Sequence, residues 1–165
     1  MTNETHATAP ANEPVLLLER VFNAPRELVW QAWTDPAHIS QWFFPRGYSV
    51  AHCEIDLRPG GKSVMDMKGP DGTIYPNKGV YLEVDPPSKL SYSDDVDEDE
   101  TAWGDNAPPS NVQTITFTDL GNNTTRLSVH IQLASVEDRD AMVKMGAREG
   151  WASSFEKLDE FLAAA

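Results

Sequence analysis

The sequence predicts an α+β fold of the helix-grip type, in which a strongly curved antiparallel sheet wraps around one long C-terminal helix and two short helices follow the first strand. Three observations lead to this prediction. Strand-like segments and turn signals alternate over most of the chain. Residues 127–133 alternate apolar and polar side chains, as in a strand with one covered and one wet face. The C-terminal segment carries an apolar stripe at helical spacing.

The length and composition fit a single domain. A chain of 165 residues, 40% of them hydrophobic, can bury about two thirds of the surface that its unfolded state exposes. Residues 1–13 are polar and lack hydrophobic periodicity, so we expect a disordered N-terminal lead. The predicted domain therefore spans residues 14–165.

The charge of the chain excludes several classes of partner. Asp and Glu number 26 against 13 Lys and Arg, and the formal net charge is -13. Because such a surface repels phosphate groups, we expect neither nucleic acid nor a membrane as partner. The chain also lacks a signal-peptide pattern and has a single cysteine, Cys53, so we expect a reduced, cytoplasmic protein.

The first part of the domain reads as one strand and two short helices. Residues 14–22 are rich in strand-forming side chains, and an Asn-Ala-Pro sequence ends them. Residues 25–33 place apolar side chains at helical spacing, with Pro25 suited to the helix start. Asp35 predicts the N-cap of a second helix that runs to about Phe43.

From Tyr48 onward the chain reads as roughly six antiparallel strands followed by a helix. Turn signals lie at 58–61, 69–72, 85–88 and 119–123. Ser135 then predicts an N-cap, and the lack of proline beyond it predicts one long terminal helix. The apolar stripe of this helix, which must lie on the covered face of the sheet, consists of Ala147, Trp151, Phe155, Leu158 and Leu162.

A curved sheet closed by one helix covers its concave face incompletely, so we expect a cavity between the two. Trp30 and Trp33 are expected to build the core. Trp42, Phe43 and Phe44 are consecutive and cannot all point inward from one helical turn, so at least one of them is expected at the cavity mouth. The predicted ligand-binding residues are Trp42, Phe43, Phe44, Met65, Met67, Tyr81, Tyr92, Trp151 and Phe155.

Some of these positions admit two interpretations. Met65 and Met67 form either a pliable cavity floor or ordinary core. The strand that contains Tyr81 has ambiguous parity, because three apolar neighbours compete with the tyrosine for the inside. Lys144 and Arg148 lie near the apolar stripe, where they either extend into solvent or offer a cation to a carboxylate ligand.

The sequence carries no catalytic motif and no known metal-ligand pattern. A nucleophile elbow, a zinc-protease motif and a dinucleotide-binding motif are all missing. His52, Glu54 and Asp56 alternate along one strand, but this spacing lacks the convergence of metal ligands. The acidic run at 94–100 lacks the glycine of a calcium loop and reads as a solvated loop that could also dock a basic partner. We therefore expect no catalytic residue, no metal and no cofactor.

Four motifs follow one another along the chain. They are RVFNAPRELVWQAWTDPAHISQWFFP, EIDLRPGGKSVMDM with GPDG, GVYLEVDPPSKLSYS, and the Gly-Trp of AREGWASSFEKLDEFL. Together they resemble the activator-of-heat-shock-90-ATPase homologue family of the START-like (SRPBCC, birch-pollen-allergen-like) superfamily. The resemblance covers residues 14–163 and implies the helix-grip fold. Its functional implication is broad, because the superfamily includes lipid and hormone binders, polyketide cyclases and a eukaryotic co-chaperone domain.

Two features depart from the pattern of that family. Trp42, Phe43 and Phe44 precede Pro45 where the family commonly has a Trp-Trp pair, a small residue and Pro. This difference changes the shape of the aromatic segment at the expected cavity mouth. Residues 93–111 form a link that is longer and more acidic than usual.

Three functions agree with these observations. The leading hypothesis is a non-enzymatic domain, a monomer or a homodimer, whose cavity takes a small apolar or amphipathic molecule. The second is a chaperone-associated module of the stress response that resembles the eukaryotic activator's domain. The third is an enzyme in which His52, Glu54, Tyr81 or Arg46 serves as acid, base or electrophile inside the cavity.

Overall fold

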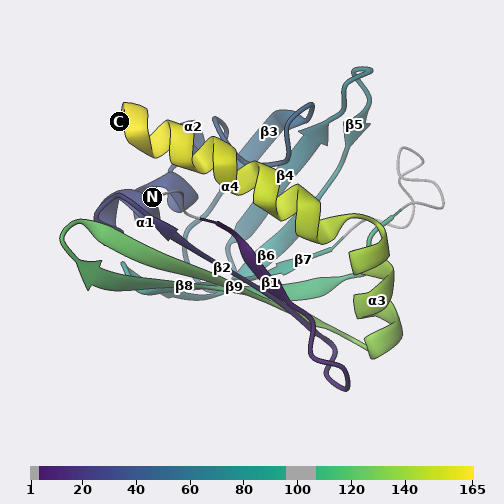
Figure 1. Ribbon diagram of the computed structural model, residues 1–165. Coiled ribbons are helices and arrows are strands. Elements are labelled where there is room, and N and C mark those ends of the chain that lie inside the picture. The colour runs from purple at the N-terminus through teal and green to yellow at the C-terminus, as the bar shows by residue number, and fades with distance from the viewer. Residues whose placement is uncertain (1–3, 96–106) are drawn as a thin grey trace.

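In the computed structural model of this chain, the described residues form a nine-stranded antiparallel sheet that does not close and that curves around a C-terminal helix (Figure 1). The structure describes residues 4–95 and 107–165. The strand order is β1-β2-β9-β8-β7-β6-β4-β3, and β5 pairs with β4. This arrangement confirms the predicted α+β helix-grip fold. The predicted acidic loop lies mostly outside the described residues.

The elements from β2 to β9 follow the predicted order, while β1 before them and the division of the C-terminal helix were not predicted. The strands are β1 (His6–Thr8), β2 (Val15–Phe22), β3 (Ser49–Ile55), β4 (Lys62–Lys68), β5 (Ile74–Tyr75), β6 (Lys78–Asp85), β7 (Lys89–Asp94), β8 (Asn111–Gly121) and β9 (Thr124–Leu133). The helices are α1 (Arg26–Thr34), α2 (Pro36–Ile39), α3 (Val136–Lys144) and α4 (Ala147–Ala164). Each of the four predicted turn segments separates two consecutive strands.

The N-terminal segment is more ordered than its composition predicts. The expectation of a disordered lead over residues 1–13 is wrong for the described part, because β1 pairs with β2. The edge of β2 presents unpaired backbone groups, which bind an extended segment whatever its side chains. Arg139 on α3, which is buried, holds the same segment in place. Its Nη1 atom donates hydrogen bonds to the carbonyl oxygens of Pro10, Glu13 and Val15 at 2.7, 3.0 and 3.1 Å.

Helix α2 begins as predicted and ends earlier. The Asp35 carboxylate caps it by accepting a hydrogen bond from the backbone N–H of Ala37 at 2.9 Å. The helix ends at Ile39 and not near Phe43. One reason is that Trp42 turns into the core, where its indole N–H donates to the carbonyl oxygen of Ala32 at 2.9 Å.

The C-terminal helical segment consists of two helices, so the prediction of one continuous helix is wrong. Helix α3 starts as predicted, with the Ser135 hydroxyl oxygen accepting from the backbone N–H of Asp138 at 3.1 Å. It ends at Lys144, and Gly146 follows with a φ of +93°. Glycine adopts this left-handed conformation without steric penalty and so ends the helix. The lack of proline in this segment therefore did not mean that the helix is continuous. In Figure 1, α3 lies at one end of the sheet and α4 runs across it.

The C-terminal half of α4 closes the hydrophobic core against the sheet. Phe155 and Leu158 are fully buried. The Phe155 ring packs edge-on against the ring of Phe22 of β2, with the two ring centroids 5.7 Å apart. Trp30 and Trp33 of α1 are buried as predicted, 9% and 1% exposed. The helix is therefore anchored by its second half.

Two glycines near the start of α4 provide a matched test of the helix break. We expect Gly146→Ala to lower the free energy of unfolding by about 1–2 kcal/mol, because an alanine is strained at this φ. Gly150 lies within α4, and a Cβ there would meet Pro45 at an ordinary 3.6 Å. Gly150→Ala should therefore raise the stability by roughly 0.5–1 kcal/mol through helix propensity. Urea unfolding measures both changes, and a loss of stability in both variants would contradict this account of the break.

Candidate ligand-binding site

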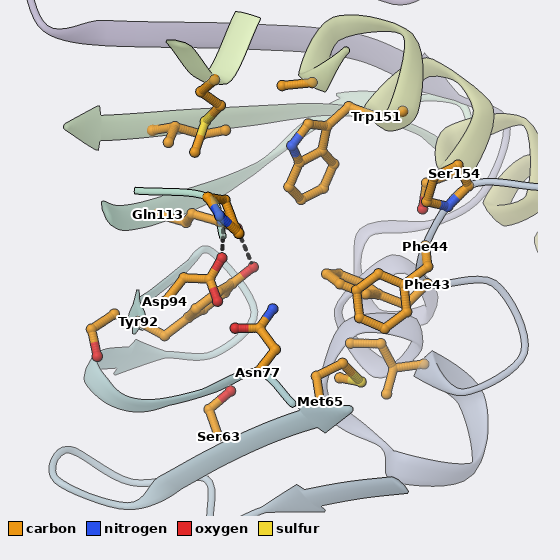
Figure 2. Close-up of a pocket in the computed structure, with 18 of the residues that line it drawn as sticks. Phe43, Phe44, Ser63, Met65, Asn77, Tyr92, Asp94, Gln113, Trp151 and Ser154 are labelled. Carbon is orange, nitrogen blue, oxygen red and sulfur yellow. Dashed lines mark hydrogen bonds between the residues drawn. The ribbon is translucent and has the colours of Figure 1, made fainter. Parts of the chain in front are cut away.

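A cavity of about 270 Å³ lies between the first half of α4 and the concave face of the sheet (Figure 2). Its volume is close to the lower end, about 300 Å³, of typical small-molecule sites. Met145, between α3 and α4, lines the cavity and is 49% exposed. The cavity therefore occupies the part of the concave face that the anchored half of α4 leaves uncovered.

One side of the cavity is an aromatic wall formed by Trp33, Phe43, Phe44 and Trp151. The Trp33 and Trp151 rings are stacked, with centroids 6.2 Å apart, and Phe43 meets Trp151 edge-on at 5.9 Å. Figure 2 shows Trp151, Phe43 and Phe44 facing the cavity, with Met65 of β4 below them. Because each ring is held by another ring, the wall is preformed in the absence of a ligand.

The loop that carries Phe43 and Phe44 is tied to α4. Ser154 donates from its hydroxyl to the carbonyl oxygen of Trp42 at 3.3 Å, and the Lys157 ammonium donates to that of Phe44 at 3.0 Å. Phe44 has a φ of +76°, which is rare for a bulky residue and costs energy. These hydrogen bonds hold the loop in a conformation that directs the Phe44 ring toward the cavity.

The opposite side of the cavity carries a polar cluster formed by Asn77, Tyr92, Asp94 and Gln113. The Tyr92 hydroxyl donates to Gln113 Oε1 at 2.6 Å, and Gln113 Nε2 donates to Asp94 Oδ2 at 3.3 Å (Figure 2). The cavity thus has a polar side that faces an aromatic side.

The surroundings of the polar cluster shift its ionisation. Loss of solvent raises the pKa of Asp94 to about 6, although hydrogen bonds from Asn111 and Asn77 oppose this shift. Burial also raises the pKa of Tyr92 well above its ordinary value and that of Tyr81 to about 12. The described residues that line the cavity include no Lys, Arg or His. The carboxylate of Asp94 therefore carries a charge that no lining side chain neutralises.

The structure places six of the nine predicted binding residues at the cavity. Tyr81 is among them because a β-bulge shifts the register of β6 between Tyr81 and Glu83, which resolves the ambiguous parity of this strand. The residues brought together are Phe43, Phe44, Met65, Tyr81, Tyr92 and Trp151.

Trp42, Met67 and Phe155 do not line the cavity. Trp42 and Phe155 are fully buried in the core, where neighbouring rings surround them. Met67 lies near the end of β4, where it pairs with Val50 of β3, and it is not among the residues that line the cavity. Lys144 and Arg148 do not line the cavity either, and both are exposed.

Among the residues that line the cavity but were not predicted there are Trp33, which was expected in the core, and Asn77, Asp94 and Gln113. Two of these polar residues left a signal in the sequence. Gln113 is in phase with the buried Ile115 along β8, and Asp94 is in phase with Tyr92 along β7. A polar residue in the inward phase of a strand indicates a polar site inside the domain. Asn77 lies between β5 and β6, where no periodicity applies.

The candidate acid, base and metal-binding residues other than Tyr81 lie away from the cavity. His52 and Glu54 are exposed, with Nε2 and Oε2 atoms 3.3 Å apart, and Arg46 pairs with Glu160 on the surface at 2.7 Å. Within residues 4–95 and 107–165, no group of three His, Cys, Asp or Glu side chains could hold a metal ion. The helices of these same ranges are too short or too polar to cross a membrane.

Asp94→Asn tests the cost of keeping a carboxylate in the cavity. Because the pKa of Asp94 is raised to about 6 when folded, against about 3.9 in an unfolded chain, the ionised side chain opposes folding increasingly as the pH rises through 6. We expect Asp94→Asn to increase the free energy of unfolding by roughly 1–3 kcal/mol at about pH 8 and by little at about pH 4. Tyr92 and Tyr81, the other shifted groups at the cavity, titrate above this window.

Urea unfolding over a pH series measures this difference, and Asp95→Asn is the matched control. Asp95 is the exposed neighbour of Asp94, and its substitution removes the same charge. An equal pH dependence in both variants would contradict the assignment of the effect to Asp94.

Comparison with known proteins identifies the family of this chain. Curated proteins give no match. A solved structure from Rhodobacter sphaeroides is 26% identical with a TM-score of 0.85, and the match covers 98% of this chain and 99% of the other. A protein from Mycobacterium smegmatis is 29% identical with a TM-score of 0.83, and the match covers 96% of this chain and 97% of the other. The AHSA1 protein from Silicibacter pomeroyi is 25% identical with a TM-score of 0.73, and the match covers 91% of this chain and 98% of the other. A family model described as Activator of Hsp90 ATPase homolog 1-like protein matches residues 23–163, and the chain belongs to that family.

Proposed function

We propose that this protein is a binding domain that takes up a small, mainly apolar molecule with one polar end in the cavity between α4 and the sheet. The observation that carries the proposal is the two-sided lining, an aromatic wall opposite a polar cluster. Ligand sites commonly combine an apolar lining with a few placed polar groups. The polar cluster would fix the orientation of the ligand and the aromatic wall would supply most of the affinity.

Cavity energetics support the same proposal. Empty apolar volume in a core costs about 24 cal/mol per Å³, so a dry cavity of this size would cost several kcal/mol. Side chains could have filled it, yet Gly146 and Gly150 both line it and leave their positions without a side chain. A bound apolar molecule would recover part of that free energy.

The family match favours a second candidate function. The family is named for an activator of the Hsp90 ATPase, so a domain that docks on a chaperone is the alternative. Stimulation of the ATPase rate of the Hsp90 from the same organism would support it. Gly150→Leu, which blocks the cavity, should stimulate the ATPase rate of Hsp90 as much as the unmodified protein does if docking does not use the cavity.

A ligand screen tests the first proposal. We expect at least one fatty acid, steroid, flavonoid, polyketide-like aromatic or aromatic amine to raise the melting temperature and to change tryptophan fluorescence, because Trp33 and Trp151 line the cavity. A ligand at a hundred times its dissociation constant stabilises the folded state by about 2.7 kcal/mol. Gly150→Leu, which places a side chain at the cavity, should abolish both responses.

Ala163→Leu is the matched control for that screen, because it adds bulk at an exposed position of the same helix. It should leave both responses unchanged. Equal responses in Gly150→Leu and in the unmodified protein, or no response to any compound, would contradict ligand binding in this cavity.

A further inference from the structure

We infer that the molecule bound in the cavity ends in a protonated amine, which Asp94 and Asn77 receive at the polar cluster. This inference rests on the proposed function and names the chemical class of its ligand: a compact apolar body with an ammonium group. Three independent features of the cavity lead to it.

The first feature is that the hydrogen-bond donors of the polar cluster are largely used within the protein. Gln113 Nε2 donates to Asp94 Oδ2 at 3.3 Å and to Asn111 Oδ1 at 3.1 Å, which occupies both of its N–H groups. The Tyr92 hydroxyl donates its one hydrogen to Gln113 Oε1. A ligand therefore meets mainly acceptors on this side of the cavity.

The second feature is an acceptor without a partner. Asn77 Oδ1 is buried and receives no hydrogen bond, and Asn77 lines the cavity. An unsatisfied buried acceptor costs about 1–3 kcal/mol, and a ligand donor would remove that cost.

The third feature is the charge of the cavity. Asp94 lines it, and no described Lys, Arg or His lines it. An ammonium would neutralise the carboxylate with a charge-assisted hydrogen bond, while the aromatic wall on the other side would contact the apolar body. A carboxylate ligand such as a fatty acid would be repelled from the same end.

The volume of the cavity limits the size of this ligand. The cavity volume of about 270 Å³ lies at the small end of the range of about 300–1,000 Å³ for small-molecule sites. The apolar body is therefore small, on the scale of one aromatic ring with a short chain.

Three probes with the same phenyl body test the inference: phenethylamine, phenethyl alcohol and phenylacetate. Isothermal titration at neutral pH should show that the amine binds at least about ten-fold more tightly than the alcohol, which corresponds to about 1.4 kcal/mol, and that phenylacetate binds most weakly. Equal or tighter binding of the alcohol or of phenylacetate would overturn the inference.

Two single-charge variants locate the effect. Asp94→Asn should weaken amine binding by about ten-fold or more and change alcohol binding by less than about three-fold. Asp95→Asn, with the same loss of charge at an exposed position, should leave amine binding within about two-fold, since exposed charges contribute little. Equal losses in both variants would overturn the role of Asp94.

Failure of this inference can be separated from failure of the proposed function. If the alcohol or phenylacetate binds best and Gly150→Leu abolishes that binding, the cavity binds ligands and only the amine preference is overturned. If none of the three probes binds at millimolar concentration, the amine inference is overturned, and the wider screen decides whether the proposed function fails with it.

Discussion

The burial of the second half of α4 in the concave face of the sheet is the constraint on which the rest of this structure depends. Phe155, Leu158 and Leu162 supply the apolar surface that holds the helix there. The first half of α4 is joined to α3 at Gly146 and meets the sheet across an open space. The cavity is thus a consequence of anchoring a straight helix at one end of a curved surface.

The aromatic wall of the cavity is continuous with the core. On its core side, the Trp33 ring packs against the rings of Phe117 of β8 and Trp42, with ring centroids 6.4 and 5.0 Å apart. At the cavity it stacks on Trp151. Closely packed interiors transmit changes in shape, so occupation of the cavity and the stability of the domain are physically coupled. Thermal stability is for this reason a direct reporter of binding in this protein.

The polar cluster reduces the stability of the domain. A carboxylate with a raised pKa and an unsatisfied amide oxygen both oppose folding, and apolar side chains of similar size would avoid that cost. Such departures from good core design are typical of functional sites. Members of one family share a fold, whereas the function of each depends on the side chains that it places at its own site.

The sequence by itself determined the order of the elements from β2 to β9, the turns between strands and the caps at Asp35 and Ser135, because these features depend on local backbone preferences and on periodicity. It also determined that Trp30 and Trp33 are buried. It did not determine which aromatic residues reach the cavity, since Trp42, Phe43 and Phe44 lie beyond the end of α2, where no periodic pattern applies.

Only the tertiary structure decided how these three rings are distributed. Trp42 enters the core because a carbonyl oxygen of α1 accepts its indole N–H, and Phe44 turns toward the cavity in a conformation that hydrogen bonds from α4 hold. The tertiary structure likewise brought Asn77, Asp94 and Gln113 together from three separate segments. Contacts between distant parts of a chain have no local signal, and the chemistry of this site depends on such contacts.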